Sequence, residues 1–98
     1  MNFIFDKEYL TAVSPDGSPM GSIHFPRIRP DLVNISDVST YPGFQGQGVA
    51  EAMMEALLTH LTTTNRKAAL TSPFAQQYVR DHGNWQHILP GQMHFTAH

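Results

Sequence analysis

The chain has two parts that differ in the spacing of their hydrophobic residues. The first forty residues contain short β-prone runs at 3–5, 9–13, 20–28 and 32–40, and in the last two of these apolar positions partly alternate with polar ones. A period of two is typical of strands with one buried face. A PDG turn at 15–17 separates the second run from the third. The first part of the chain is therefore predicted to form several antiparallel strands.

Two of these runs are irregular. Pro26 lies near the end of the third run and cannot donate to a ladder, so that end is predicted to be an edge or a bulge. In the fourth run the apolar positions change from odd to even between Ile35 and Val38. This slip predicts a β-bulge near Ser36 and Asp37.

After a turn at Pro42 and Gly43, the period changes to 3.6. The apolar positions then form one continuous helical face that ends before the polar cluster at 62–67. Residues 68–70 are predicted to be a short buried strand. The helical face is expected to consist of Ala50, Met53, Met54, Leu57, Leu58 and Leu61.

A second helix is predicted from its capping residues. Ser72 is a suitable N-cap and Pro73 fits the first helical position; the helix should run to about Asp81, with His82 and Gly83 closing it. The segment 86–98 predicts no particular element. The fold class is therefore α+β in one domain spanning 1–98, a compact, mainly antiparallel sheet with two main helices.

Composition excludes several functions. The net charge is −2 with no basic run, so neither nucleic acid nor a membrane surface is expected as a partner. There is no cysteine, which excludes disulfides and thiol chemistry. The N-terminus lacks the apolar run of a signal peptide, so a cytoplasmic location is expected. His94 and His98 lack a third ligand nearby, so no metal is expected.

The stretch PGFQGQGVA at 42–50 places two glycines directly before the first helix. A helix N-terminus carries unpaired N–H groups and roughly half a positive charge, which favours a phosphate. A Walker loop is excluded because Gly48 is followed by Val49 and Ala50, and the Rossmann fingerprint fails because Glu51 stands where a small residue is needed. A plain connection without a ligand is the alternative.

The hexapeptide Gln45-Gly46-Gln47-Gly48-Val49-Ala50 fits the pattern Arg/Gln-x-x-Gly-x-Gly/Ala. It resembles the acyl-CoA pyrophosphate loop of the GNAT superfamily of N-acetyltransferases. The following segment SPFAQQYVRDH at 72–82 is similar to the small single-domain branch of that family, and the resemblance covers about residues 8–88. The branch often has arginine at Gln45, His-Thr at Asp37 and Val38, and cysteine at Ser72.

The resemblance implies an acetyl-CoA cofactor and an amine acceptor, either a small molecule or a protein. Alternatives are a non-catalytic CoA-binding or protein-interaction module on a degenerate GNAT scaffold, and an unrelated α+β binding domain. The acetyl thioester is expected along 36–40, and Gln47 and Gly48 should donate backbone N–H bonds. The cofactor-binding residues implied are Val38, Ser39, Thr40, Gln45, Gly46, Gln47, Gly48, Val49, Ala50, Ser72 and Phe74.

Transfer to an amine requires a base, oxyanion stabilisation and a proton for the thiolate. Asp37 is the candidate base, although an Asp at a bulge can simply cap it or face solvent. His24 on the neighbouring strand is the second candidate because its intrinsic pKa suits the role. In the GNAT superfamily a tyrosine on the second helix often protonates the leaving thiolate, so the resemblance implies Tyr78 as the candidate acid; a tyrosine packed against Trp85 is the alternative. For Ser72, helix capping is the preferred interpretation.

The acceptor is not specified by the sequence. Larger relatives have a helical insertion after the first strand, and the turn-rich segment 6–17 leaves no room for one. The acceptor groove is therefore expected to be open, or completed by a partner subunit in a homo-oligomer.

Overall fold

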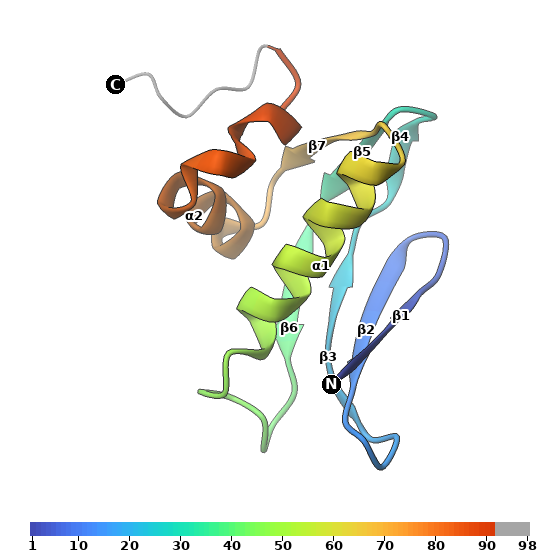
Figure 1. The fold of residues 1–98 in the computed structure, drawn as a ribbon, viewed down its shortest axis with the longest axis vertical. Helices are drawn as coiled ribbons and strands as arrows, with labels where there is room; N and C mark the ends of the chain where they lie inside the picture. The colour runs from blue at the N-terminus through green and yellow to red at the C-terminus, as the bar shows by residue number, and fades with distance from the viewer. Residues whose placement is uncertain (92–98) are drawn as a thin grey trace.

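The computed structural model describes residues 1–91 of the 98. Figure 1 shows strands on one side of a long helix and a second helix beside it. In chain order the elements are β1 (Asn2–Phe5), β2 (Tyr9–Val13), β3 (Pro19–His24), β4 (Arg27–Arg29), β5 (Leu32–Ile35), β6 (Asp37–Thr40), α1 (Val49–Thr63), β7 (Lys67–Leu70), α2 (Pro73–Asp81) and the 3-10 helix η1 (Gly83–Ile88).

The strands form two sheets. The first has the order β1-β2-β3-β6 and is antiparallel throughout; the second has the order β4-β5-β7, in which β7 runs parallel to β5. Helix α1 contacts strands of both sheets and thereby joins them. The predicted α+β class with a mainly antiparallel arrangement and two main helices is confirmed.

The core lies between α1 and the strands. Met53, Met54, Leu57, Leu58 and Leu61 are completely buried, as the 3.6 period predicted. The first residue of the face differs from the prediction: Val49 is buried, whereas Ala50 is only half-buried. The strands contribute their alternate positions, including Leu10, Ala12, Ile23, Val33 and Ile35.

Both irregular runs are broken in the structure. The third run is split around Pro26 into β3 and β4, which belong to different sheets. The fourth run is split at Ser36, whose backbone N–H donates to the His24 carbonyl at 3.0 Å. The predicted bulge is therefore the point where the chain leaves the second sheet as β5 and enters the first as β6.

The C-terminal elements confirm one prediction and add an element. Ser72 caps α2, because its Oγ accepts from the Ala75 N–H at 3.2 Å. Helix η1, which the sequence analysis did not predict, follows immediately and buries Ile88. A 3-10 helix of six residues has too few turns to produce a readable hydrophobic period. The pair His94 and His98 lies outside the described residues.

None of the helices between residues 1 and 91 has the length and apolar character needed to cross a membrane.

Candidate functional site

The loop between β6 and α1 depends on its glycines. Gly43, Gly46 and Gly48 have φ values of +92°, +79° and +76°, which other residues adopt only with strain. A Cβ placed on any of the three would meet no atom within 4 Å. The glycines are therefore required by backbone conformation, and the space in front of them is open to a ligand.

The loop leaves the first donors of α1 without partners. The first helical hydrogen bond runs from the Ala52 N–H to the Gly48 carbonyl at 3.0 Å. Gly48 is the N-cap and has no side chain to accept from the helix. In the described chain, the backbone N–H groups of Val49, Ala50 and Glu51 accordingly have no hydrogen-bond acceptor. Together with the helix dipole, they favour an anion here.

A cavity of about 390 Å³ lies at this end of α1 and is called the loop cavity below. Its volume falls within the range of ~300–1,000 Å³ that is usual for small-molecule sites. The sequence analysis predicted every lining residue except Glu51, which occupies the third helical position. The lining consists of Thr40, Gln45, Gly46, Gly48, Val49, Ala50 and Glu51.

Gln47 does not line the loop cavity, although it was predicted to bind the cofactor. Its side-chain Nε2 instead donates to the Gly43 carbonyl at 3.4 Å, across the turn. Gln47 therefore helps to fix the loop conformation, and its backbone contact with a cofactor stays a prediction.

Strand β6 has unpaired backbone N–H groups along the sheet edge that begins at the loop cavity. The Tyr41 N–H donates to the Met20 carbonyl at 2.9 Å. This hydrogen bond identifies which N–H groups of β6 face β3. Because donors alternate in antiparallel pairs, the Ser39 N–H faces β3 while those of Val38 and Thr40 face away from it. Since β6 ends the order of its sheet, these two N–H groups point to the open side.

The two candidate bases lie side by side at the other end of β6. His24 of β3 and Asp37 of β6 are register partners. The His24 Nε2 lies 3.8 Å from Glu8 Oε1, and its Nδ1 lies 3.4 Å from Ser36 Oγ. Asp37 is exposed, and its Oδ2 accepts from Ser39 Oγ at 2.8 Å. The fold therefore brings both candidate bases to the break between β5 and β6.

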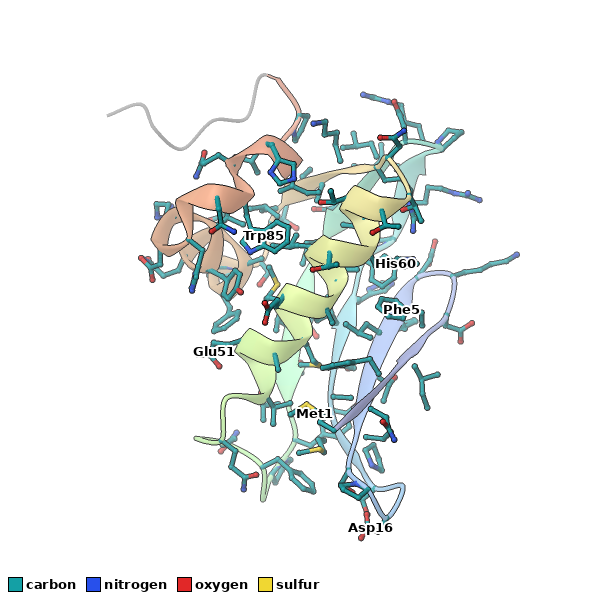
Figure 2. The ribbon with its side chains drawn as sticks, viewed as in Figure 1. Met1, Phe5, Asp16, Glu51, His60 and Trp85 are labelled. Carbon is teal, nitrogen blue, oxygen red and sulfur yellow. The ribbon has the colours of Figure 1, made fainter. Side chains whose placement is uncertain are left out.

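Tyr78 on α2 is nearly buried, with 8% of its surface exposed, and its ring stacks on that of His82 at 4.1 Å. Burial raises the pKa of the Tyr78 phenol above its usual value, and the charge of Glu55 and, less strongly, of Glu51 raises it further; a hydrogen bond with Trp85 acts in the opposite direction. Both glutamates belong to the first two turns of α1, and Figure 2 shows Glu51 on the side facing α2. Tyr78 is thus close to Trp85, as its structural alternative predicted.

Ser72 and Phe74 lie on α2 or at its start and do not line the loop cavity. Ser72 is buried with 3% exposure and is engaged as the helix cap. Phe74 is half-buried against the core. Their contact with a cofactor stays a prediction.

Comparison with known proteins identifies the family. The model of the GCN5-related N-acetyl-transferase family matches residues 8–88. The chain belongs to this family. The match runs from the residue before β2 to the end of η1, so it leaves out β1 and includes the glycine loop and both α-helices; this is the range covered by the resemblance in the sequence. A search among curated proteins found no match.

Solved structures of GCN5-related acetyltransferases share the fold. A GCN5-like putative N-acetyltransferase from Staphylococcus aureus has a TM-score of 0.73 at 18% identity, and the match covers 99% of this chain and 95% of that one. Rv2747 from Mycobacterium tuberculosis, solved in complex with CoA, has a TM-score of 0.62 at 24% identity over 78% of this chain and 47% of its own. A GNAT-family acetyltransferase from S. aureus Mu50 has a TM-score of 0.61 at 12% identity, covering 76% and 51%.

Proposed function

We propose that this member of the GCN5-related family is an acetyl-CoA-dependent N-acetyltransferase. The loop cavity is the observation that carries the proposal, because it combines unpaired helix donors, left-handed glycines and open space. Family membership and the fold shared with the CoA complex of Rv2747 support the choice of CoA over other phosphorylated ligands.

The residues present fit the pyrophosphate of CoA. Val49 and Ala50 offer backbone N–H groups, and the missing Cβ atoms of Gly46 and Gly48 allow phosphate oxygens to approach the backbone. The Glu51 carboxylate in the lining is the one unfavourable charge. Figure 2 shows Glu51 on the side of α1 that faces α2.

The acetyl thioester would supply the activated acyl group, and residues of this chain would place it. The free N–H group of Thr40 on β6 suits an amide carbonyl of the pantetheine arm, as it would that of an added strand. At the end of β6, the Val38 N–H is positioned to stabilise the thioester carbonyl oxygen as it becomes negative. The hydrogen bonds between β6 and β3 hold these N–H groups in place, so the backbone does not have to move when the cofactor binds or reacts.

Three side chains are proposed to move protons. His24 or Asp37 accepts a proton from the acceptor amine, because the two lie together at the end of β6. Tyr78 returns a proton to the departing thiolate. Because burial and neighbouring carboxylates raise its pKa, the phenol is protonated at neutral pH and holds a proton to donate.

The first test is acetyl-CoA binding by calorimetry, comparing the unaltered protein with Gly48→Glu. The substitution puts a carboxylate into the loop cavity, and we expect binding in the micromolar range to be lost. Gly43→Glu is the matched control: it adds the same charge and backbone strain to the same loop, outside the cavity lining. Equal loss in both variants, or no binding by the unaltered protein, contradicts the proposal.

A CoA-binding module without turnover is the second candidate. It is favoured by the burial of Tyr78 and by the use of Ser72 as a helix cap, which leave few free groups on α2 for chemistry. Amine-dependent release of CoA distinguishes the two candidates. Release that is lost in Asp37→Asn or Tyr78→Phe, with acetyl-CoA binding retained, would rule out the module.

A further inference from the structure

A second cavity has a volume of about 230 Å³, and all of the described residues that line it are charged. The β1–β2 turn contributes Asp6, Lys7 and Glu8, strand β4 contributes Arg27, and the segment after α1 contributes Arg66. It is called the charged cavity below. The chain as a whole has six Lys and Arg residues and no basic run, so tertiary folding alone gathers three of them around one cavity.

The charges around this cavity do not neutralise one another. Within the described residues, no ion pair joins Lys7, Arg27 or Arg66 to either carboxylate of the cavity. By contrast, Arg29 on the same strand as Arg27 pairs with Asp31 at 3.0 Å. Three cations and two carboxylates thus face one space while being held apart, an arrangement that suits a ligand with groups of both signs.

The position of the cavity relates it to the transfer site. Glu8 lines the cavity and also lies 3.8 Å from the Nε2 of His24, the register partner of Asp37. Asp37 begins β6, and Thr40 at the other end of β6 lines the loop cavity. The four residues of β6 span about 10 Å, at ~3.3 Å per residue.

The two cavities therefore lie toward opposite ends of β6. Figure 1 shows the β1–β2 turn and β4 toward the end of the molecule where α1 finishes, whereas the glycine loop is at the end where α1 begins. A cofactor held by the loop and running along β6 would deliver its acetyl group beside His24, next to Glu8 of the charged cavity.

We propose that the charged cavity binds the acceptor and that the acceptor is a small amino acid, with its carboxylate on Arg27 and Arg66 and its amine against Glu8 beside His24. This inference rests on the proposed function. The planar fork of an arginine matches a carboxylate in two hydrogen bonds. Arg66 keeps donors for this purpose, since only its Nε is engaged, with Thr64 Oγ1 at 3.0 Å. The cavity volume lies below the usual ~300 Å³, which favours a ligand of few atoms.

These groups account for every bond and proton that changes in the transfer. The ammonium of the amino acid loses one proton to the carboxylate–imidazole group of Glu8 and His24. Its nitrogen then forms the C–N bond to the acetyl carbon while the C–S bond breaks. A second proton leaves the nitrogen for solvent, and the sulfur takes up one proton from Tyr78. The proton held by Glu8 and His24 then returns through solvent to the Tyr78 phenolate. The products are an N-acetylamino acid, CoA and one proton released to solvent.

The test compares the common L-amino acids, β-alanine and 4-aminobutyrate, each against its amide, by acetyl-CoA-dependent CoA release. At least one amino acid should react with a kcat/KM more than tenfold above that of its amide. In Arg27→Gln this preference should fall below twofold through KM, with kcat little changed. Arg29→Gln is the matched control, because Arg29 lies on the same strand outside the cavity, and it should keep the preference.

Failure of this inference is distinguishable from failure of the proposed function. A protein that binds acetyl-CoA and acetylates amides as well as acids, or keeps its preference in Arg27→Gln, overturns the acceptor site alone. Thermal shift with the same amino acids in the absence of acetyl-CoA provides a direct measurement: stabilisation lost in Arg27→Gln and Arg66→Gln supports the site even for a protein without turnover. Equal stabilisation by the amides overturns it.

Discussion

At the scale of single residues, the glycines of this chain serve two different purposes. Gly46 and Gly48 are needed for a left-handed backbone, with open space where a side chain would be. Gly21 on β3 has no such conformation, but a Cβ there would lie 2.6 Å from the Ser39 carbonyl oxygen and 3.0 Å from the Met53 methyl. Gly21 is therefore required because β6 and α1 approach the strand closely.

Gly21→Ala is expected to lower the free energy of unfolding by about 1–3 kcal/mol, the usual cost of overpacking, since the nearest atom is backbone and cannot rotate away. Chemical denaturation measures the change. Gly83→Ala is the control, because a Cβ at Gly83 meets nothing within 4 Å and its backbone is ordinary, so its effect should stay within about 0.5 kcal/mol. Equal effects in the two variants would contradict the close-approach explanation.

At the scale of single residues, a feature could be predicted from the sequence only where its signal was local. The glycine loop was recognised because spacing and neighbours are visible within six residues. Glu51 was missed as a lining residue, although its place in the first helical turn was a readable signal. Glu8, Arg27 and Arg66 gave no signal, because they meet only after residues far apart in the chain are folded together.

At the scale of elements, both α-helices were predictable because their signals repeat or are strongly local. The apolar face of α1 recurs over four turns, and α2 begins with a Ser-Pro pair. The extended runs were located correctly, although two of them are each divided into two strands, and the sequence did not indicate which strands pair. Whether β5 and β6 form one bulged strand or two strands in different sheets depends on β3 and β7, which lie elsewhere in the sequence.

The cap of α2 gives an element-scale prediction. Ser72→Ala removes the acceptor of the Ala75 N–H and is expected to cost about 1 kcal/mol, which for a domain of this size corresponds to a fall in Tm of roughly 4–8 °C. Thermal unfolding followed by circular dichroism measures it. Ser72→Thr keeps a hydroxyl acceptor and should lose distinctly less. If the alanine variant is as stable as the original protein, the cap contributes nothing measurable to α2.

At the scale of the whole molecule, the β1–β2 hairpin contacts helix α1 through a pair of stacked aromatic rings. Figure 2 shows Phe5 of β1 beside His60 of α1, and their ring centroids lie 4.3 Å apart. Burial, and secondarily the charge of Arg66, lowers the pKa of His60 below its ordinary value of 6.5. The contact thus favours the neutral imidazole.

This contact predicts a pH dependence. As pH falls below about 6.5, the unfolded chain takes up a proton at His60 before the folded chain does, so stability falls on acidification. Between pH 7 and pH 5, the unaltered protein should lose more stability than His60→Gln, as measured by urea unfolding at each pH. An identical pH profile in the two proteins would show that His60 titrates equally in the folded and unfolded states.

The sequence by itself determined the class of fold, the position of α1 and α2, and the glycine loop, because periodicity, caps and turn residues act over a few neighbouring positions. Only the tertiary structure decided that the chain leaves the second sheet after β5 and enters the first as β6, that the outward N–H groups of β6 lead from the loop cavity, and that His24 and Asp37 meet at its far end. It also assembled the charged cavity from three separate segments. The physical reason is range: pairing of strands and convergence of charges depend on contacts between distant residues, for which a single sequence carries no local signal.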